Sequence, residues 1–198
     1  INSNTLLELL QADVREILLY CSTLQTMPAH VLQQVPAPGR WSVAQVLEHL
    51  NFYARYYITA IEQKLHLNQS GPNRDFTPGW LGNYFTKLMK PTEEKTIASK
   101  MKSPSNAVPS AQPAAAAMLT EFINHQHHLL NLLQIARTAN LEYNRIPTSL
   151  TKLIKLKLGD TFRFFIAHEQ RHFLQIERTL SEISVQQKAV DNMKAMAM

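Results

Sequence analysis

Apolar residues recur at helical spacing in four long segments of the chain. On a helical wheel, each segment places its apolar side chains on one stripe and most of its polar side chains elsewhere, as amphipathic helices do. The chain shows no convincing pair of strands, so the pattern predicts an all-α fold, a four-helix bundle. The predicted helices span residues 6–24, 42–66, 113–139 and 161–183.

The second segment has the clearest start. In the stretch WSVAQV, Ser42 can cap the amide of Gln45 while the Gln45 side chain reaches back, and Trp41 can pack on Val46. This capping box fixes the phase of the helix that follows. Weaker candidates for helix caps are Thr5 with Glu8 in the first segment and Asp160 before the fourth.

Long connections lie before and after the third predicted helix. Residues 67–112 are irregular apart from a short helix expected at WLGNYFTKLMK, and connections of this length do not force a simple up-down-up-down order. A chain of 198 residues with 45% hydrophobic residues has the size and composition of one domain. We assign residues 1–185 to a single helical domain and expect residues 186–198 to be a frayed or disordered tail.

The composition narrows the classes of protein that need to be considered. The single cysteine, Cys21, excludes an intrachain disulfide framework and suits a reducing compartment. The N-terminus lacks the features of a secretory signal, although the missing initiator Met leaves open whether residues precede Ile1. No segment approaches the roughly 18 apolar residues of a membrane span. We therefore expect a soluble, cytoplasmic protein.

The charge of the chain does not indicate a polyanionic partner. The formal net charge is +5, but the Lys and Arg residues are dispersed, and no run combines them with stacking aromatic residues. The basic stretch TKLIKLKLGD is too short to favour membrane binding and is better interpreted as the packed entry to the fourth helix. We expect no nucleic acid and no membrane as partners, and a small molecule as the substrate.

Residues 168–172 read HEQRH, a pattern that can bind a metal ion. Residues four apart stand on one face of a helix, so His168 and His172 can offer their imidazoles to one ion. Glu169 falls at the centre of the apolar arc, where an unpartnered carboxylate costs several kcal/mol. The alternative is that both histidines are partly exposed polar residues and that Glu169 forms a structural ion pair.

His49 is a credible third ligand from another helix. It follows the Ser42 cap by two helical turns and shares its stripe with apolar residues, so it faces the interior or its edge. Three neutral imidazoles and a water molecule make an open site for Zn²⁺, Ni²⁺ or Fe²⁺. His125, on the inner stripe of the third helix, is a weaker candidate and can act as a donor to the ligands or as a fourth ligand.

The pattern W-S-x(6)-H-L from Trp41, with the late H-E-x-R-H-x-x-Q-I from His168, resembles the DinB and YfiT-like superfamily of bacterial four-helix proteins. The resemblance implies an up-down-down-up bundle, often dimeric, that binds a divalent metal through one histidine of helix two and two of helix four. Those positions are His49, His168 and His172 here. Characterised relatives include metal-dependent transferases that use bacillithiol or mycothiol, and a mycothiol-dependent maleylpyruvate isomerase; others are labelled metal-dependent hydrolases.

These observations lead to one preferred hypothesis for the function. A metal-dependent enzyme would use the ion to lower the pKa of a bound thiol or water, with Glu169 or Tyr53 orienting or deprotonating it. Cys21 lacks a partner pattern, so the thiol would come from a low-molecular-weight cofactor. The expected activity is that of a thiol-dependent S-transferase or a related hydrolase.

Two alternatives remain at this stage. A zinc protease of the H-E-x-x-H type needs a further downstream ligand, but Gln175 and Arg178 stand where the longer protease motif has Gly and His. A non-catalytic metal-binding helical protein would need a fourth protein ligand such as His125, because structural zinc sites are usually closed.

Overall fold

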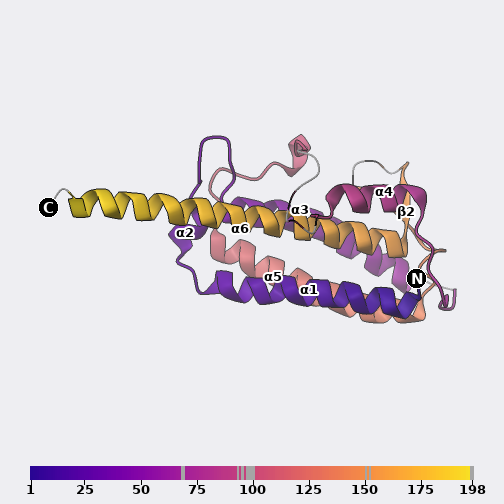
Figure 1. Ribbon diagram of the computed structural model, residues 1–198. Helices are drawn as coiled ribbons and strands as arrows, with labels where there is room; N and C mark the ends of the chain where they lie inside the picture. The colour runs from indigo at the N-terminus through magenta and orange to yellow at the C-terminus, as the bar shows by residue number, and fades with distance from the viewer. Residues whose placement is uncertain are drawn as a thin grey trace.

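The computed structural model of the protein describes residues 1–67, 70–92, 94, 96, 101–149, 151 and 153–196, and most of them are helical (Figure 1). The four long helices are α1 (Ser3–Gln25), α3 (Val43–His66), α5 (Ala115–Ile135) and α6 (Leu158–Met196). The short helices are α2 (Ala29–Gln33), α4 (Trp80–Met89) and the 3₁₀ turns η1 (Ser105–Ala107) and η2 (Ala136–Thr138). The fourth predicted helix is therefore α6, and the short helix expected at WLGNYFTKLMK is α4.

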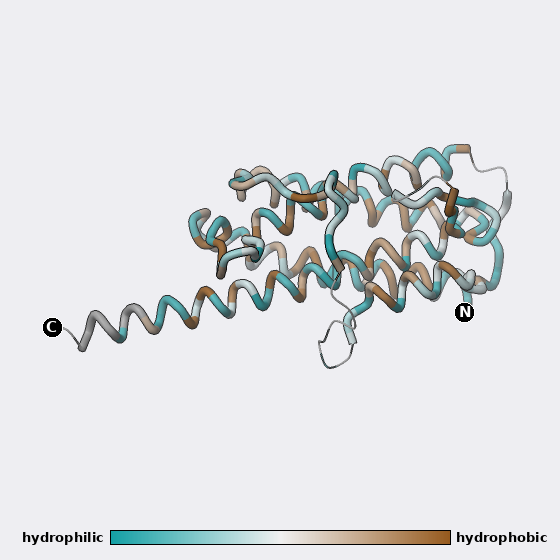
Figure 2. The backbone as a smooth tube through the Cα atoms, turned by 90° about the horizontal axis from the view of Figure 1, so that it is seen from above, coloured by the Kyte–Doolittle hydropathy of each residue, from teal (hydrophilic) through white to brown (hydrophobic). Residues whose placement is uncertain are grey.

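The long helices form a bundle in which α1 and α3 each pack against both α5 and α6. Hydropathy alternates along each tube in Figure 2, as expected for helices that bury one face. The prediction of an all-α, four-helix fold is confirmed, whereas the up-down-down-up order stays a prediction. Helix α4 lies along the beginning of α6, inside the long connection before α5 (Figure 1).

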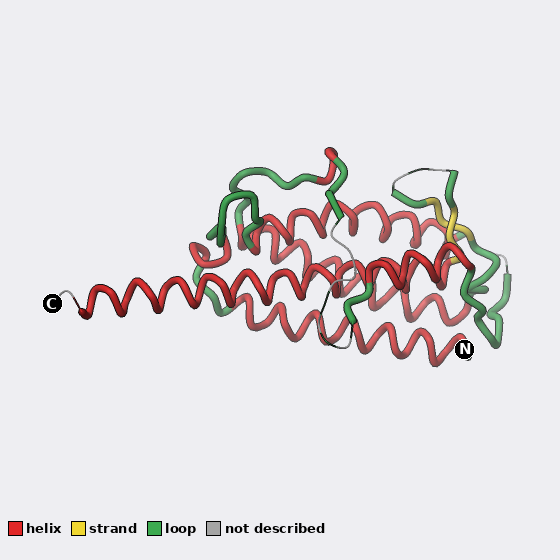
Figure 3. The backbone as a smooth tube through the Cα atoms, turned by 45° about the horizontal axis from the view of Figure 1, so that its top comes forward, coloured by secondary structure: helices red, strands yellow, loops and turns green. Residues whose placement is uncertain are grey.

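A small hairpin directly before α6 was not predicted from the sequence. Strand β1 (Arg145–Pro147) pairs antiparallel with β2 (Lys155–Lys157), and both are yellow in Figure 3. Three residues are too few for alternation of apolar and polar positions to stand out, and Pro147 argues against a strand. The basic stretch that we interpreted as the entry to the fourth helix is therefore partly strand, and its Leu156 is buried.

The helix starts agree with the sequence in one case and differ in the others, and α3 ends at His66 as predicted. The capping box at α3 is confirmed, since Ser42 N donates to Gln45 Oε1 (2.9 Å) and Gln45 N donates to Ser42 Oγ (3.2 Å). Helix α1 starts earlier than predicted because Asn2, not Thr5, accepts the first amides. Asp160 lies inside the first turn of α6, where its Oδ2 accepts from the Gly79 amide (2.7 Å).

Helix α6 is much longer than its apolar stripe. It continues past Ile183, the predicted end, as far as Met196, so residues 186–196 are helical rather than frayed. No Gly or Pro stops the helix there, and residues such as Gln, Lys, Ala and Met favour helix. The end of α6 extends beyond the other long helices (Figures 1 and 3). Residues 197 and 198 lie outside the described residues, and the domain limit at residue 185 stays a prediction.

The core is divided into two apolar clusters, one toward each end of the bundle. On α6, the first cluster ends at Ile166 and the second begins at Phe173. The residues between them on α6 include the three polar side chains that the HEQRH pattern indicated, and α5 contributes the buried Gln126 between its own apolar residues. The predicted site therefore lies where the apolar core is interrupted.

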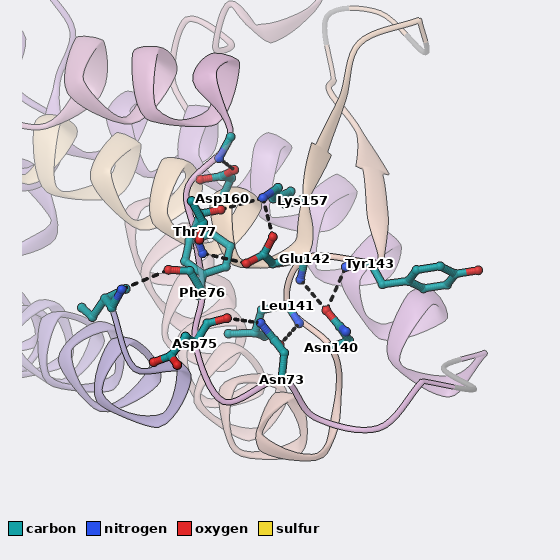
Figure 4. Close-up of polar contacts among 12 residues, drawn as sticks. Asn73, Asp75, Phe76, Thr77, Asn140, Leu141, Glu142, Tyr143, Lys157 and Asp160 are labelled. Atoms are coloured by element: carbon teal, nitrogen blue, oxygen red, sulfur yellow. Dashed lines mark hydrogen bonds and ion pairs between the residues drawn. The ribbon is translucent and has the colours of Figure 1, made fainter.

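A polar network closes the end of the bundle near the start of α6 (Figure 4). Lys157 Nζ donates to Thr77 O (2.6 Å) and to Glu142 Oε2 (2.7 Å), and Glu142 Oε1 accepts from Thr77 N (2.8 Å). Asn73 Oδ1 accepts from the Leu141 amide (2.8 Å). These bonds join the two long connections and fix the first turn of α6.

Gly82 of α4 lies directly against the Asp160 side chain of α6. A Cβ at this position would overlap the buried Asp160 side chain. We expect Gly82→Ala to lower the free energy of unfolding by about 1–3 kcal/mol, because α4 must move away or Asp160 must leave its partners. Urea unfolding measures this loss. Gly71→Ala is the control, because an added Cβ there meets nothing within 4 Å. Equal stability of the two variants would contradict the proposed close packing.

Candidate metal centre

Three histidines from two helices converge on one point. His49 projects from α3, and His168 and His172 project from successive turns of α6. The ring centroids lie 4.7 Å apart for His49 and His172, 5.5 Å for His49 and His168, and 4.6 Å for His168 and His172. One possible ligand atom from each ring lies within 4.8 Å of the others. The structure thus brings together the three residues that the sequence indicated, and they could hold one metal ion.

Hydrogen bonds orient two of these rings. His49 Nδ1 lies 2.8 Å from the carbonyl oxygen of Ala107, and His172 Nδ1 lies 2.9 Å from Gln175 Oε1. Because a carbonyl or amide oxygen only accepts, both Nδ1 atoms carry the proton in the neutral ring, and the Nε2 lone pairs remain for a ligand. Ser103 Oγ also donates to the Ala107 carbonyl (3.1 Å), which holds this loop against His49.

The histidines are poor bases in the folded protein. Burial lowers the pKa of His49 and His168, and it lowers the pKa of His172 to about 3. The neighbouring imidazoles act in the same direction on His168 and His172, because a charge on one ring disfavours a charge on the next. All three rings are therefore neutral near pH 7, which is the form that binds a metal ion. Three neutral imidazoles fit a borderline divalent metal such as Zn²⁺, Ni²⁺ or Fe²⁺.

The histidines lie in the wall of a cavity of about 860 Å³. Helix α6 supplies one side of the cavity, and the segments around Trp41 and Ser103 supply others. Trp41 packs on the His49 ring with centroids 5.0 Å apart. The volume is in the range of small-molecule sites. An ion held by the three imidazoles would therefore face a space that can admit a substrate.

Tyr53 belongs to this group, whereas Glu169 does not. Tyr53 lines the cavity, and its ring centroid lies 5.0 Å from that of His49 and 4.8 Å from that of His168. Glu169 is 0% exposed and does not line the cavity; its Oε1 accepts from Gln126 Nε2 on α5 (2.8 Å). Its burial was predicted from the helical wheel. The catalytic roles of Tyr53 and Glu169 stay predictions.

The other candidates lie elsewhere. His125 Nδ1 contacts Asn51 Oδ1 (3.2 Å), and His125 is not part of the three-histidine group. Cys21 is buried, and burial raises the pKa of its thiol to about 12, which makes it a poor nucleophile. Gln175 was not predicted as a partner of His172. Their spacing of three residues on one helix could have indicated it.

One of the comparisons with known proteins identifies a family. Within the part of the chain that the structure describes, no helix combines the length and hydropathy needed to cross a bilayer. Neither the curated proteins nor the solved structures gave a match. The family model of the DinB superfamily matches residues 12–176, a range that contains His49, His168 and His172. The chain therefore belongs to the DinB superfamily.

Proposed function

We propose that the protein is a metal-dependent enzyme that activates a thiol or water for attack on a small-molecule substrate. The observation that carries this proposal is the convergence of three neutral imidazoles in the wall of a large cavity. Zn²⁺, Ni²⁺ or Fe²⁺ bound there would lower the pKa of a coordinated thiol or water toward neutral pH. Cys21 is buried, and its raised pKa keeps the thiol protonated near neutral pH. The reacting thiol would therefore belong to a low-molecular-weight cofactor.

Tyr53 is the better placed of the two predicted catalytic residues. Burial raises the pKa of its phenol, so the hydroxyl keeps its proton near pH 7. A neutral phenol beside the histidines can donate a hydrogen bond to the nucleophile or to the leaving group. We propose that Tyr53 orients the nucleophile or the leaving group through this hydrogen bond. Glu169 stays a predicted base, although its hydrogen bond to Gln126 favours a role in the core.

Two observations favour an enzyme over the alternatives. A structural zinc site usually has four protein ligands, and the described residues offer a group of three histidines with His125 apart from it. A protease of the H-E-x-x-H type uses the glutamate as its base at the metal, whereas Glu169 hydrogen bonds to α5. The more specific proposal is an S-transferase, in which the thiol is the nucleophile. A hydrolase would use the same site with water as the nucleophile.

The test compares metal-free protein with protein loaded with Zn²⁺, Ni²⁺ or Fe²⁺. Each form is incubated with a small thiol and 1-chloro-2,4-dinitrobenzene, and separately with 4-nitrophenyl acetate and no thiol. We expect turnover that depends on the metal in at least one assay and that falls to the background rate in His49→Ala. Turnover unchanged by removal of the metal would contradict the proposal.

We also propose a cytoplasmic location and a homodimeric assembly. The single, buried cysteine supports a reducing compartment. Membership of the superfamily supports the dimer. Sedimentation equilibrium of the purified chain distinguishes a dimer from a monomer.

Gln175 is expected to control the affinity of the site through His172. Replacement by Leu removes the acceptor of the Nδ1 proton, and we expect zinc affinity to fall about 10–100-fold. Gln175→Glu keeps an acceptor and is expected to retain most of the affinity. Competition with a chromophoric chelator measures both variants. Equal affinity of the Leu variant and the wild type would show that this hydrogen bond does not orient the ring.

A further inference from the structure

The cavity that contains the three histidines also has a basic wall. Four cationic side chains line it, and Glu182 is the one acidic side chain among the described lining residues. The cations are Arg40, Lys102, Arg171 and Arg178. The lining thus has three more positive than negative charges, not counting the neutral histidines. This is a large local share of the formal net charge of +5 of the whole chain.

The charges are ordered along α6. His168, His172, Gln175 and Arg178 follow one another at spacings of three or four residues and all line the cavity. At a rise of 1.5 Å per residue, Arg178 stands about 9 Å from His172 along the helix axis. Arg171 lies between the two histidines and Arg178 lies beyond them, so cationic side chains extend along α6 from the level of the candidate metal centre.

The segments facing α6 continue this cationic region. Arg40, directly before Trp41, pairs with Glu182 (3.1 Å), so this carboxylate is already used by a cation of the wall. Lys102 comes from the loop whose Ser103 helps to hold His49. Arg171 is buried and donates to the Leu88 carbonyl (3.3 Å), and burial lowers the pKa of its guanidinium.

Several cations around one concave space attract an anion even where each also has a partner in the protein. Their fields add over the concave surface, and because Arg40, Lys102 and Arg178 are exposed, salt screens them. Arg binds carboxylate and phosphate groups through its planar set of donors. An uncharged ligand would gain little from this arrangement, whereas a cation would be repelled.

We propose that the cavity binds an anionic small molecule whose oxyanion group lies toward Arg178, nearly two helical turns beyond His172 on α6. The anionic end contacts Arg178 and Lys102, while the reactive end lies beside His172 and Tyr53. The proposal rests on the proposed function for the reactive end only. The cationic wall selects carboxylate- or phosphate-bearing molecules whether or not a metal ion is bound.

Two matched pairs of thiols test this selection by titration calorimetry. N-acetylglutathione is compared with its diamide, in which both carboxylates are amides and the molecule is uncharged, and 4′-phosphopantetheine is compared with pantetheine. In at least one pair, we expect the anionic member to bind at least about tenfold more tightly, as expected for one charge-assisted contact, with a preference that falls as salt rises. The pair that shows the preference distinguishes carboxylate from phosphate.

The variants Arg178→Gln and Lys102→Gln are expected to reduce that ratio toward one, and Arg178→Lys to keep most of it. Arg145→Gln, an exposed arginine on β1 that does not line the cavity, is the control for the same change in net charge. Thermal unfolding of each variant verifies that it is folded. A ratio near one in both pairs for the wild type, or a ratio unchanged in both Gln variants, would overturn the proposal.

Each titration is carried out on metal-free and on zinc-loaded protein. The preference for the anion is expected in both forms, because the cations do not depend on the metal. If zinc fails to bind but the preference persists in metal-free protein, the metal-centre proposal fails and the anion site stands. If zinc binds and no preference for the anion is found, the anion-site proposal fails and the metal-centre proposal stands.

Discussion

His49→Ala is expected to weaken zinc binding by more than about 100-fold, which exceeds the loss typical of an outer hydrogen-bond partner. His49 is the one ligand candidate that α3 contributes, so its loss leaves only the two histidines of α6. Two imidazoles four residues apart can still bind an ion, but they hold it weakly and leave more positions to water. Titration against a chelator of known affinity, near pH 7, measures the change.

His66→Ala is the matched control for this experiment. His66 is exposed at the end of the same helix and does not belong to the three-histidine group. The His66→Ala substitution should leave zinc affinity unchanged, which separates the loss of a ligand from the loss of any histidine. Circular dichroism verifies that both variants keep the helical fold. Wild-type affinity in the His49→Ala variant would show that His49 is not a ligand.

Glu169→Gln is expected to stabilise the metal-free protein above about pH 5. Burial raises the pKa of this carboxyl from 4.5 to about 8, so the folded state binds its proton more tightly than the unfolded state. The wild type therefore has the full contribution of the protonated carboxyl below pH 4.5 and loses it as the pH rises toward 8. A neutral amide does not titrate and avoids this loss.

The size of this effect follows from the pKa change. At about 1.4 kcal/mol per pKa unit, the stability difference between variant and wild type should grow from pH 5 and approach about 4–5 kcal/mol above pH 8. The contacts support the sign, because Glu169 Oε2 and Gln126 Oε1 are both buried acceptors with no hydrogen-bond partner among the described residues. A proton on Glu169, or an amide in its place, supplies the missing donor.

Urea unfolding between pH 5 and pH 9, in the presence of a chelator, measures this difference. A pH-independent difference would show that the carboxyl is not buried as described. The same variant tests the predicted role of Glu169 as a base. If zinc-loaded Glu169→Gln keeps its turnover, the residue serves the core, whereas a loss of turnover with intact zinc affinity would support the base.

Much of the three-histidine group could be predicted because it depends on helix phase. The Ser42 cap fixed the face on which His49 lies, and the spacing of His168 and His172 placed both rings on one side of α6. The same periodicity placed Glu169 in the core. A helix that starts at a known residue leaves little freedom for the side chains two turns later.

The remaining contacts of the site leave no periodic signal in the sequence. The partner of His49 is the backbone carbonyl of Ala107, and any residue type at that position offers the same oxygen. Its place follows from the path of the connection before α5, which no local pattern in the sequence determines. The hairpin before α6 was missed for a related reason, since strands of three residues are fixed mainly by the helices they pack on.

The full length of α6 could not be predicted from its apolar periodicity either. The apolar stripe ends near Ile183, but the helix continues with residues that favour helix, and its Gln186 side chain donates to the Pro36 carbonyl (2.8 Å). Apolar periodicity reports the buried portion of a helix and not its full length.

X-ray absorption at the zinc K edge of the zinc-loaded protein, prepared without a histidine tag, tests the metal centre most directly. We expect three imidazole nitrogens at about 2.0 Å and one or two light-atom ligands from solvent. In the His49→Ala variant, the same measurement should show one imidazole nitrogen fewer. A shell of four protein ligands, or one with fewer than three imidazoles, would contradict the open three-histidine centre.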